Sequence, residues 1–152
     1  MISKTRKSRD IENEELQRSK LAEKLSKKLG PYTTIPEISE CWFLFHETPV
    51  VKVLAKYSSN YNNSSKWFWG ITERDWELWK TDDLIALIYQ NDIGGNSYIL
   101  LKQPELKRIL SNTKPSKDGS RKINMRKSSD TDKLYFQEMN TFDIAKRSCI
   151  LK

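Results

Sequence analysis

Three leucines recur at intervals of four within the strongly charged residues 1–30: Leu21, Leu25 and Leu29. In an α-helix this interval puts them on one narrow apolar stripe, which packs against a domain along a single edge. Gly30 and Pro31 then end the pattern, because glycine readily takes the left-handed turn after a helix and proline cannot continue one. The sequence therefore predicts an N-terminal helix packed on the domain, with homodimerisation through the same stripe as the alternative.

This helix is expected to begin near Asp10, whose side chain can accept hydrogen bonds from the free backbone N–H groups of a first turn. Residues 1–9 hold four basic side chains without apolar partners, a composition typical of a mobile basic arm. Residues 10–152 are long enough to bury a core and fit within the size of one domain. The predicted organisation is an arm at 1–9 followed by a single domain at 10–152.

Uninterrupted apolar runs predict several strands. Residues 84–89 are continuously apolar, as expected of a central strand that is covered on both faces. The turn residues at 91–96 and the returning strand at 97–102 complete a hairpin with it. The runs at 41–45 and 49–54 are apolar enough for buried strands, although either could be a short helix.

Tryptophans are concentrated in residues 67–79, which hold four of the five in the chain. A strand at the start of this segment places Trp67 and Trp69 on one face, with Lys66 and Phe68 on the other. The two faces of this strand therefore differ, and the tryptophan face is expected to point inward.

A short helix is expected directly after this strand. Thr72 can cap its first turn, and Ile71 and Trp76 occupy the two positions of a hydrophobic staple. Trp79 lies three residues after Trp76 and shares its helix face. Since the staple commits Trp76, Trp79 is the indole expected to be partly open to solvent.

The rest of the chain mixes both kinds of element. A helix is expected to begin at Pro104, residues 121–127 alternate as a strand does, and residues 134–139 form a last strand. Because helices and strands are interspersed around a short hairpin, the predicted fold class is α+β, a small mixed or antiparallel sheet with flanking helices.

Charge is unevenly distributed along the chain. The net charge of +7 divides into +4 for residues 1–30, −3 for 31–103 and +6 for 104–152. Two basic segments that flank an aromatic-rich middle favour nucleic acid or another polyanion as the partner. A solvated basic surface without a partner is the alternative.

Two features bear on the compartment. Cys41 and Cys149 lie far apart and lack metal-ligand spacing, which is typical of reduced thiols in a cytosolic protein. No apolar run is long enough to span a bilayer and no secretory signal is visible. The sequence predicts a soluble, cytoplasmic protein without a membrane partner.

The leading candidate site is a basic patch on a predicted loop and the strand that follows it. Its residues are Lys114, Lys117, Arg121, Lys122, Asn124, Arg126 and Lys127. Cations on a strand face and an adjoining loop can follow a phosphate backbone, and Asn124 could contact a base edge. DNA is favoured over RNA as the ligand. A lysine-rich edge strand that avoids aggregation is the alternative.

Asp83 and Lys102 have the outline of the PD-(D/E)XK nuclease pattern, in which converging acids hold magnesium near a lysine. In that family the second acid stands two residues before the lysine, and Leu100 occupies that position here. The chain therefore departs from the pattern at a residue that the metal requires. We expect no metal or other cofactor, with a divergent magnesium-dependent nuclease as the alternative.

The tryptophans have two possible uses. Trp67, Trp69 and Trp79 could stack on bases, and a cage of Trp67 or Trp69 with Tyr89 or Tyr98 could read a flipped base. Strand alternation and the staple favour a plain core instead.

The aromatic stretch at 67–71, with Trp76 and Trp79 and the apolar rhythm of 84–89 and 97–110, resembles small α+β domains of prokaryotic restriction and defence proteins. The likeness covers residues 66–126 and carries over no functional positions. It implies DNA binding or a decayed nuclease. Together with the charge pattern it predicts a non-catalytic nucleic-acid-binding protein, and a protein-interaction module is a further alternative.

Overall fold

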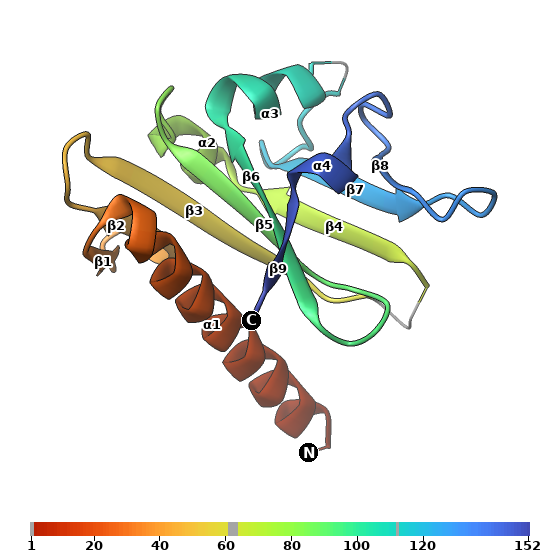
Figure 1. Ribbon diagram of the computed structural model, residues 1–152, viewed down its shortest axis with the longest axis horizontal. Coiled ribbons are helices and arrows are strands. Elements are labelled where there is room, and N and C mark those ends of the chain that lie inside the picture. The colour runs from red at the N-terminus through yellow and green to blue at the C-terminus, as the bar shows by residue number, and fades with distance from the viewer. Residues whose placement is uncertain (1, 61–63, 112) are drawn as a thin grey trace.

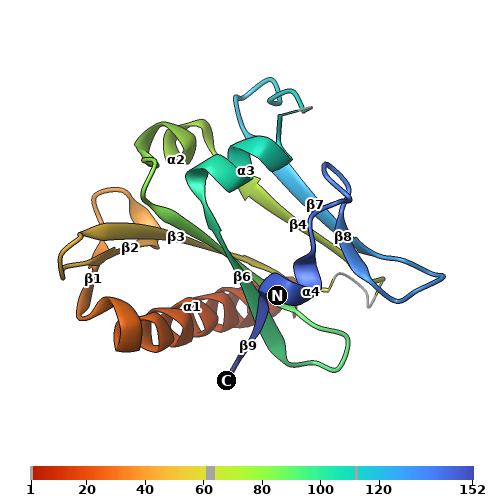
Figure 2. The ribbon, with the colours of Figure 1, turned by 45° about the horizontal axis from the view of Figure 1, so that its top comes forward.

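The computed structural model describes residues 2–60, 64–111 and 113–152, with side chains from residue 12 onward. The helices in these ranges are α1 (Ile2–Leu29), α2 (Glu73–Leu78), α3 (Gln103–Ile109) and α4 (Ile144–Arg147). The strands are β1 (Tyr32–Ile35), β2 (Ser39–Phe45), β3 (Val51–Ser58), β4 (Lys66–Ile71), β5 (Leu84–Gln90), β6 (Asn96–Lys102), β7 (Arg121–Lys127), β8 (Leu134–Phe136) and β9 (Ser148–Leu151). Helix α1 and a three-stranded sheet cover opposite faces of a six-stranded sheet (Figures 1 and 2), which confirms the predicted α+β class.

The six-stranded sheet has the order β1-β2-β3-β5-β6-β9. Its β3–β5 pair is parallel and its other neighbouring pairs are antiparallel, so the sheet is mixed. The chain crosses from β3 to β5 through β4 and α2. Strand β5 is buried along almost its whole length, as expected for residues 84–89, and forms the predicted hairpin with β6. The apolar run at 41–45 falls in β2, and the run at 49–54 overlaps β3, which begins at Val51.

Helix α1 packs on one face of this sheet through the predicted stripe. Leu21 and Leu25 are buried against strand residues that include Phe43 and Ile88. The stripe is therefore used within the chain, and two copies could pair through it only if α1 left the sheet.

No helix in the described part of the chain is long and apolar enough to cross a membrane.

The start of α1 requires a correction. The helix begins at Ile2, not near Asp10, so the backbone of residues 2–9 belongs to the helix. These residues include neither glycine nor proline, and nothing in them stops a helix. The basic side chains of the expected arm lie outside the described side chains.

The three-stranded sheet has the order β4-β7-β8 and is antiparallel throughout. The indole N–H of Trp67 donates to the carbonyl oxygen of Gln90 at 2.7 Å, and that of Trp69 to the carbonyl oxygen of Ile88 at 2.9 Å. Both acceptors belong to β5, so the two tryptophans join the sheets by hydrogen bonds as well as by apolar packing.

Helix α2 forms as expected, but it ends before Trp79, so Trp76 and Trp79 do not share a helix face. Thr72 caps it by accepting a hydrogen bond from the backbone N–H of Asp75 at 3.0 Å. Because α2 ends at Leu78, Trp79 takes an extended backbone and its side chain is only 2% exposed. The expectation of a partly open Trp79 is wrong; Trp76 is the partly buried indole.

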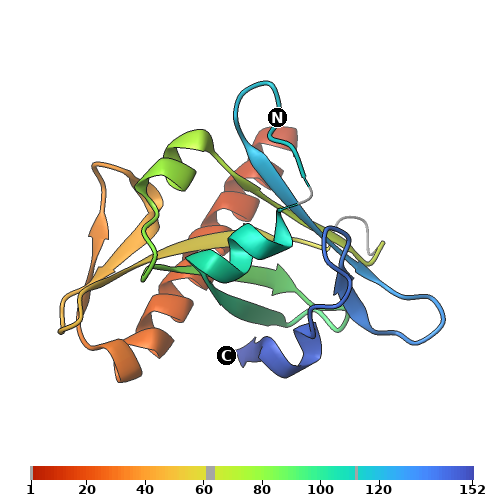
Figure 3. The same cartoon turned by 90° about the horizontal axis from the view of Figure 1, so that it is seen from above.

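The C-terminal region differs most from the prediction. The last strand expected at 134–139 ends at Phe136 as β8, and the chain continues into α4 and β9, which the sequence pattern did not indicate. Strand β9 adds to the edge of the six-stranded sheet beside β6. Seen from above in Figure 3, α2 and α3 lie in front of the six-stranded sheet and α1 lies behind it.

The two faces of β4 are expected to respond differently to substitution. Trp69→Phe removes a buried donor and leaves a gap in the core, so it should lower the free energy of unfolding by about 2–3 kcal/mol. Phe68→Ala, on the exposed face, should lower it by less than about 1 kcal/mol. Urea denaturation of both variants tests this, and equal losses would contradict the assigned faces.

Candidate nucleic-acid interface

The side of the small sheet that faces away from the core carries basic and aromatic side chains from all three strands. Strand alternation turns them outward, because the residues between them are buried. We call this surface the basic sheet face; it consists of Lys66, Phe68, Lys122, Arg126 and Tyr135. This face combines residues of β4 with residues of β7, the basic strand at 121–127 that the sequence predicted as part of the site.

Strand register orders this face into three rows, namely Lys66–Arg126–Tyr135, Phe68–Asn124 and Gly70–Lys122. Adjacent strands are about 5 Å apart, and same-face neighbours along one strand are about 7 Å apart. Phe68 therefore lies between a row with two cations and a row with one.

Phe68 is 55% exposed, more than any other phenylalanine, tyrosine or tryptophan in the described ranges. The ammonium nitrogen of Lys122 lies 6.0 Å from the centre of its ring. At this distance a cation is attracted to the negative face of the ring. The two side chains thus form a small aromatic and cationic unit at the surface.

The cations of the face keep free capacity for a ligand. Within residues 2–60, 64–111 and 113–152, no ion pair joins Lys66, Lys122 or Arg126 to a carboxylate. Carboxylate charges act on two of them from a greater distance: Arg126 partly opposes the burial that raises the pKa of Glu138, and Lys122 adds to the hydrogen bonds that lower the pKa of Asp118. One nitrogen of Arg126 donates to the carbonyl oxygens of Trp67 at 3.3 Å and Met125 at 3.1 Å. A guanidinium has five N–H donors, so these bonds hold the group in place and leave others available.

Two of the predicted site residues are turned to the other side of β7. Arg121 stacks on the ring of Trp76, with its guanidinium carbon 4.5 Å from the ring centre. Lys127 forms an ion pair with Asp92 at 2.5 Å. Both share the strand parity of the buried Ile123, so the predicted set is divided between two faces.

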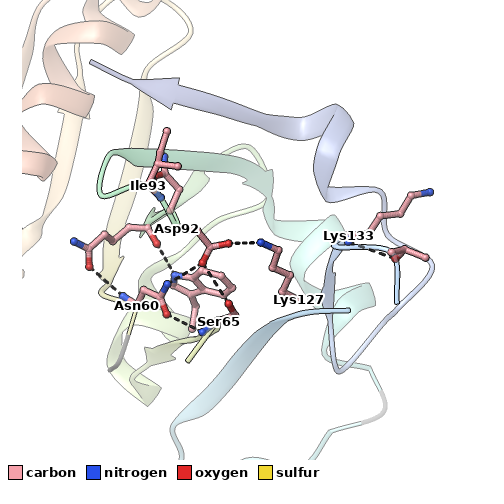
Figure 4. Close-up of polar contacts among 10 residues, drawn as sticks. Asn60, Ser65, Asp92, Ile93, Lys127 and Lys133 are labelled. Atoms are coloured by element: carbon pink, nitrogen blue, oxygen red, sulfur yellow. Dashed lines mark hydrogen bonds and ion pairs between the residues drawn. The ribbon is translucent and has the colours of Figure 1, made fainter. Parts of the chain in front are cut away.

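Asp92 is the centre of a polar network that ties the β5–β6 turn to the end of β7 (Figure 4). It accepts hydrogen bonds from Asn60 Nδ2 at 3.0 Å, Ser65 Oγ at 3.3 Å and Lys127 Nζ. The hydrogen bond from Lys127 is the main reason why the pKa of Asp92 is lowered, and it raises the pKa of Lys127 in turn. The geometry gives Lys127 a structural partner within the chain.

Lys114 and Lys117 are exposed on the loop between α3 and β7. Backbone hydrogen bonds between Ser116 and Ser120 and between Gly119 and Ser116, each 2.8 Å long, shape this loop. The loop leads directly into β7 and adds two positive charges next to that strand in sequence, together with one negative charge, Asp118, whose pKa is lowered by hydrogen bonds within the loop and by the charge of Lys122.

Asn124 lies on the outward side of β7, but its amide is partly engaged. Its backbone N–H and its Nδ2 both donate to Oε1 of Glu138, the latter at 3.3 Å. Burial raises the pKa of the Glu138 carboxyl, against the opposing effect of these donors. The base-edge contact predicted for Asn124 is therefore restricted mainly to its carbonyl oxygen.

Asp83 is occupied by contacts within the chain. Its carboxylate accepts from the backbone N–H groups of Lys52 at 3.0 Å and Lys80 at 2.9 Å, and pairs with Lys52 Nζ at 2.8 Å. Lys102 is exposed on β6, where it pairs with Leu84, the residue that follows Asp83. In the part of the chain that the structure describes, no three His, Cys, Asp or Glu side chains cluster as metal ligands. The magnesium-dependent alternative stays a prediction.

The candidate stacking tryptophans lie in the core. Trp67, Trp69 and Trp79 are exposed to 1, 1 and 2%. Trp67 contacts Tyr89 edge to face at 5.9 Å, whereas Tyr98 belongs to the cluster on the opposite face of the six-stranded sheet, under α1. None of these three indoles offers a face to solvent, and the two tyrosines do not meet in one cage.

No known protein family, curated protein or solved structure matches the chain. The likeness to restriction and defence domains therefore stays a prediction. Sequence reasoning did not assign Lys66, Phe68 or Tyr135 to the site. Alternation already turned Lys66 and Phe68 away from the tryptophans, but the pairing of β4 with β7, which joins them to Lys122, spans more than fifty residues of chain.

Proposed function

We propose that the protein binds nucleic acid without catalysing a reaction on it. The basic sheet face forms the centre of the binding surface, and Lys114 and Lys117 extend it. DNA is the favoured ligand, because the resemblance to restriction and defence domains implies DNA. The proposed compartment is the cytoplasm, which fits the free thiols of Cys41 and Cys149.

One observation carries the proposal. Three cations that form no ion pair with a carboxylate in the described residues, Lys66, Lys122 and Arg126, occupy the rows on either side of the exposed Phe68 on one sheet face. Phosphate binding by such cations is favourable because it releases counterions condensed on the nucleic acid. A face whose only task was to prevent strand pairing would gain from the lysines but not from an exposed phenylalanine.

The aromatic ring also favours nucleic acid over other polyanions. Sulfated or phosphorylated polymers that lack bases offer nothing for Phe68 to cover, whereas every nucleobase has an apolar face that an aromatic side chain can contact. Asp83, the candidate metal ligand, is held by three donors of this chain, which fits binding without metal-dependent cleavage.

The test is fluorescence polarisation of the full chain with short labelled DNA and RNA over a salt series from about 50 to 200 mM. We expect the logarithm of the binding constant to fall linearly with the logarithm of salt concentration, with a slope of about −2 to −4, as three to five phosphate contacts require. Undetectable binding at the lowest salt, or binding indifferent to salt, would overturn the proposal.

A further inference from the structure

We infer that the ligand of the basic sheet face is unpaired nucleic acid, a single strand with a base stacked on Phe68 and its phosphates held by Lys66, Lys122 and Arg126. This inference rests on the proposed function and specifies which form of nucleic acid the site takes. The chemistry is an exposed base face on a phosphate backbone, which single-stranded DNA and RNA share.

The shape of the surface argues against reading a duplex. The major groove of DNA is about 12 Å wide and admits an α-helix or a two-stranded ribbon. The basic sheet face spans three strands, and β7, its central strand, is flanked on both sides by β4 and β8. A sheet of that width, backed by the core, meets a duplex only along its phosphates, where Phe68 would have no base to contact.

Phe68 has the properties that base stacking needs. Its ring is exposed, it has no hydrogen-bonding group, and it stands one row from cations on either side. In a single strand the bases are free to turn onto an aromatic side chain while the backbone stays within reach of lysine and arginine. Tyr135, across the sheet beside Arg126, offers a second ring further along the same face.

Gly70 is a second and independent observation. It is the last but one residue of β4 and follows Phe68 on the same face, and glycine weakens a strand by up to about 0.5–1 kcal/mol relative to alanine. A Cβ atom built on it would meet nothing within 4 Å, and its φ does not lie in the left-handed region. Neither packing nor backbone conformation therefore requires glycine there. A bare backbone in a strand is typical of a place where a ligand approaches closely, and here it leaves open space on the outer face next to Phe68 in β4 and opposite Lys122 in β7.

The inference predicts that the single-stranded form binds at least about tenfold more tightly than a duplex of the same sequence at low salt. Phe68→Ala should weaken single-strand binding by about five- to 100-fold, the range seen when one base loses its aromatic partner. Duplex binding should change by less than about twofold, and Phe68→Trp should retain single-strand affinity.

Gly70→Val is expected to lower single-strand affinity without lowering the stability of the fold. Valine suits an exposed strand position, so the variant should be at least as stable as the wild type in urea denaturation. Its side chain fills the opening beside Phe68, so we expect single-strand affinity to fall by about fivefold or more. The matched control for Phe68→Ala is Ile150→Ala on β9, which also truncates an exposed apolar strand residue, at 62% exposure, but on the other sheet.

The measurements separate the inference from the proposed function. Failure of the wild type to bind any DNA or RNA overturns both. Binding that favours the duplex, or that is unchanged in Phe68→Ala and Gly70→Val, overturns the inference and leaves the proposed function standing. Self-association of the wild type that Phe68→Ala abolishes, without nucleic-acid binding, would assign the face to a second copy of this chain and overturn both.

Discussion

The triple variant K66Q/K122Q/R126Q is expected to bind nucleic acid about two to three orders of magnitude more weakly than the wild type at about 50 mM salt. Each phosphate contact contributes about 0.7–0.9 to the slope of log binding constant against log salt, which at this salt concentration amounts to roughly tenfold in affinity. The slope itself should become shallower by about 2, as measured by polarisation over a salt series. All three side chains project from the same face and form no ion pair in the described ranges. Glutamine at position 126 can still donate to the carbonyl oxygens that Arg126 contacts, so the fold should tolerate the replacements.

The matched control is K20Q/K27Q/K28Q on α1. It removes the same net charge from exposed positions on the other side of the six-stranded sheet. If binding depended on net charge alone, the two triple variants would lose affinity and slope equally. A large loss in the face variant with less than about threefold in the α1 variant is the result that the basic sheet face requires.

How far this surface could be predicted depends on the range of the interactions that build it. Alternation within one strand is local, and it is enough to place Lys122 and Arg126 on the face opposite to Ile123 and Met125, as the structure has them. The same rule places Arg121 on the side of the buried residues, although its charge suggested a ligand contact. Its stacking on Trp76 is a contact that only the fold reveals.

The pairing of strands, by contrast, cannot be predicted from the sequence of either strand alone. Phe68 and Lys122 come together because β4 pairs with β7, and the register of that pair is fixed by burial of the tryptophan face against β5. Nothing local to Phe68 indicates which strand will lie beside it. The sequence alone therefore does not distinguish Phe68 as a site residue, and the clustered tryptophans are the more prominent stacking candidates.

A similar limit applies to Asp75. The sequence places it in the first turn of a helix, where the positive end of the helix dipole stabilises a carboxylate. In the fold its carboxylate also accepts from the indole of Trp42 at 3.0 Å and pairs with Lys56 at 2.8 Å. These partners lie on β2 and β3, so Asp75 connects α2 to the six-stranded sheet in a way that only tertiary packing creates.

Asp75→Asn is accordingly expected to lower the free energy of unfolding at neutral pH by about 3 kcal/mol, because it leaves the half-buried ammonium group of Lys56 without its counter-charge. The loss should also depend on pH. Burial is the largest influence on the pKa of Asp75 and raises it, but the hydrogen bond and charge of Lys56, with Trp42 and Thr72, outweigh burial and leave the pKa below its ordinary 3.8.

The sign of that pH dependence follows from the lowered pKa. A carboxyl whose pKa is lower in the folded state contributes fully to stability above its unfolded pKa of about 4, and the contribution disappears as the pH falls through the folded value. The wild type should therefore lose stability more steeply than Asp75→Asn between about pH 5 and 2, as followed by urea denaturation at each pH.

The double variant Lys56→Met/Asp75→Asn distinguishes the ion pair from the other roles of Asp75. Removing both charges abolishes the unpaired ammonium group, so the double variant should recover about 1–2 kcal/mol relative to Asp75→Asn alone. If it is no more stable than the single variant, the loss comes from the weaker hydrogen bond that the Trp42 indole donates to asparagine and from loss of the negative charge near the helix N-terminus. Nucleic-acid binding should be unchanged in the double variant, because Lys56 and Asp75 lie between α2 and the six-stranded sheet and not on the basic sheet face.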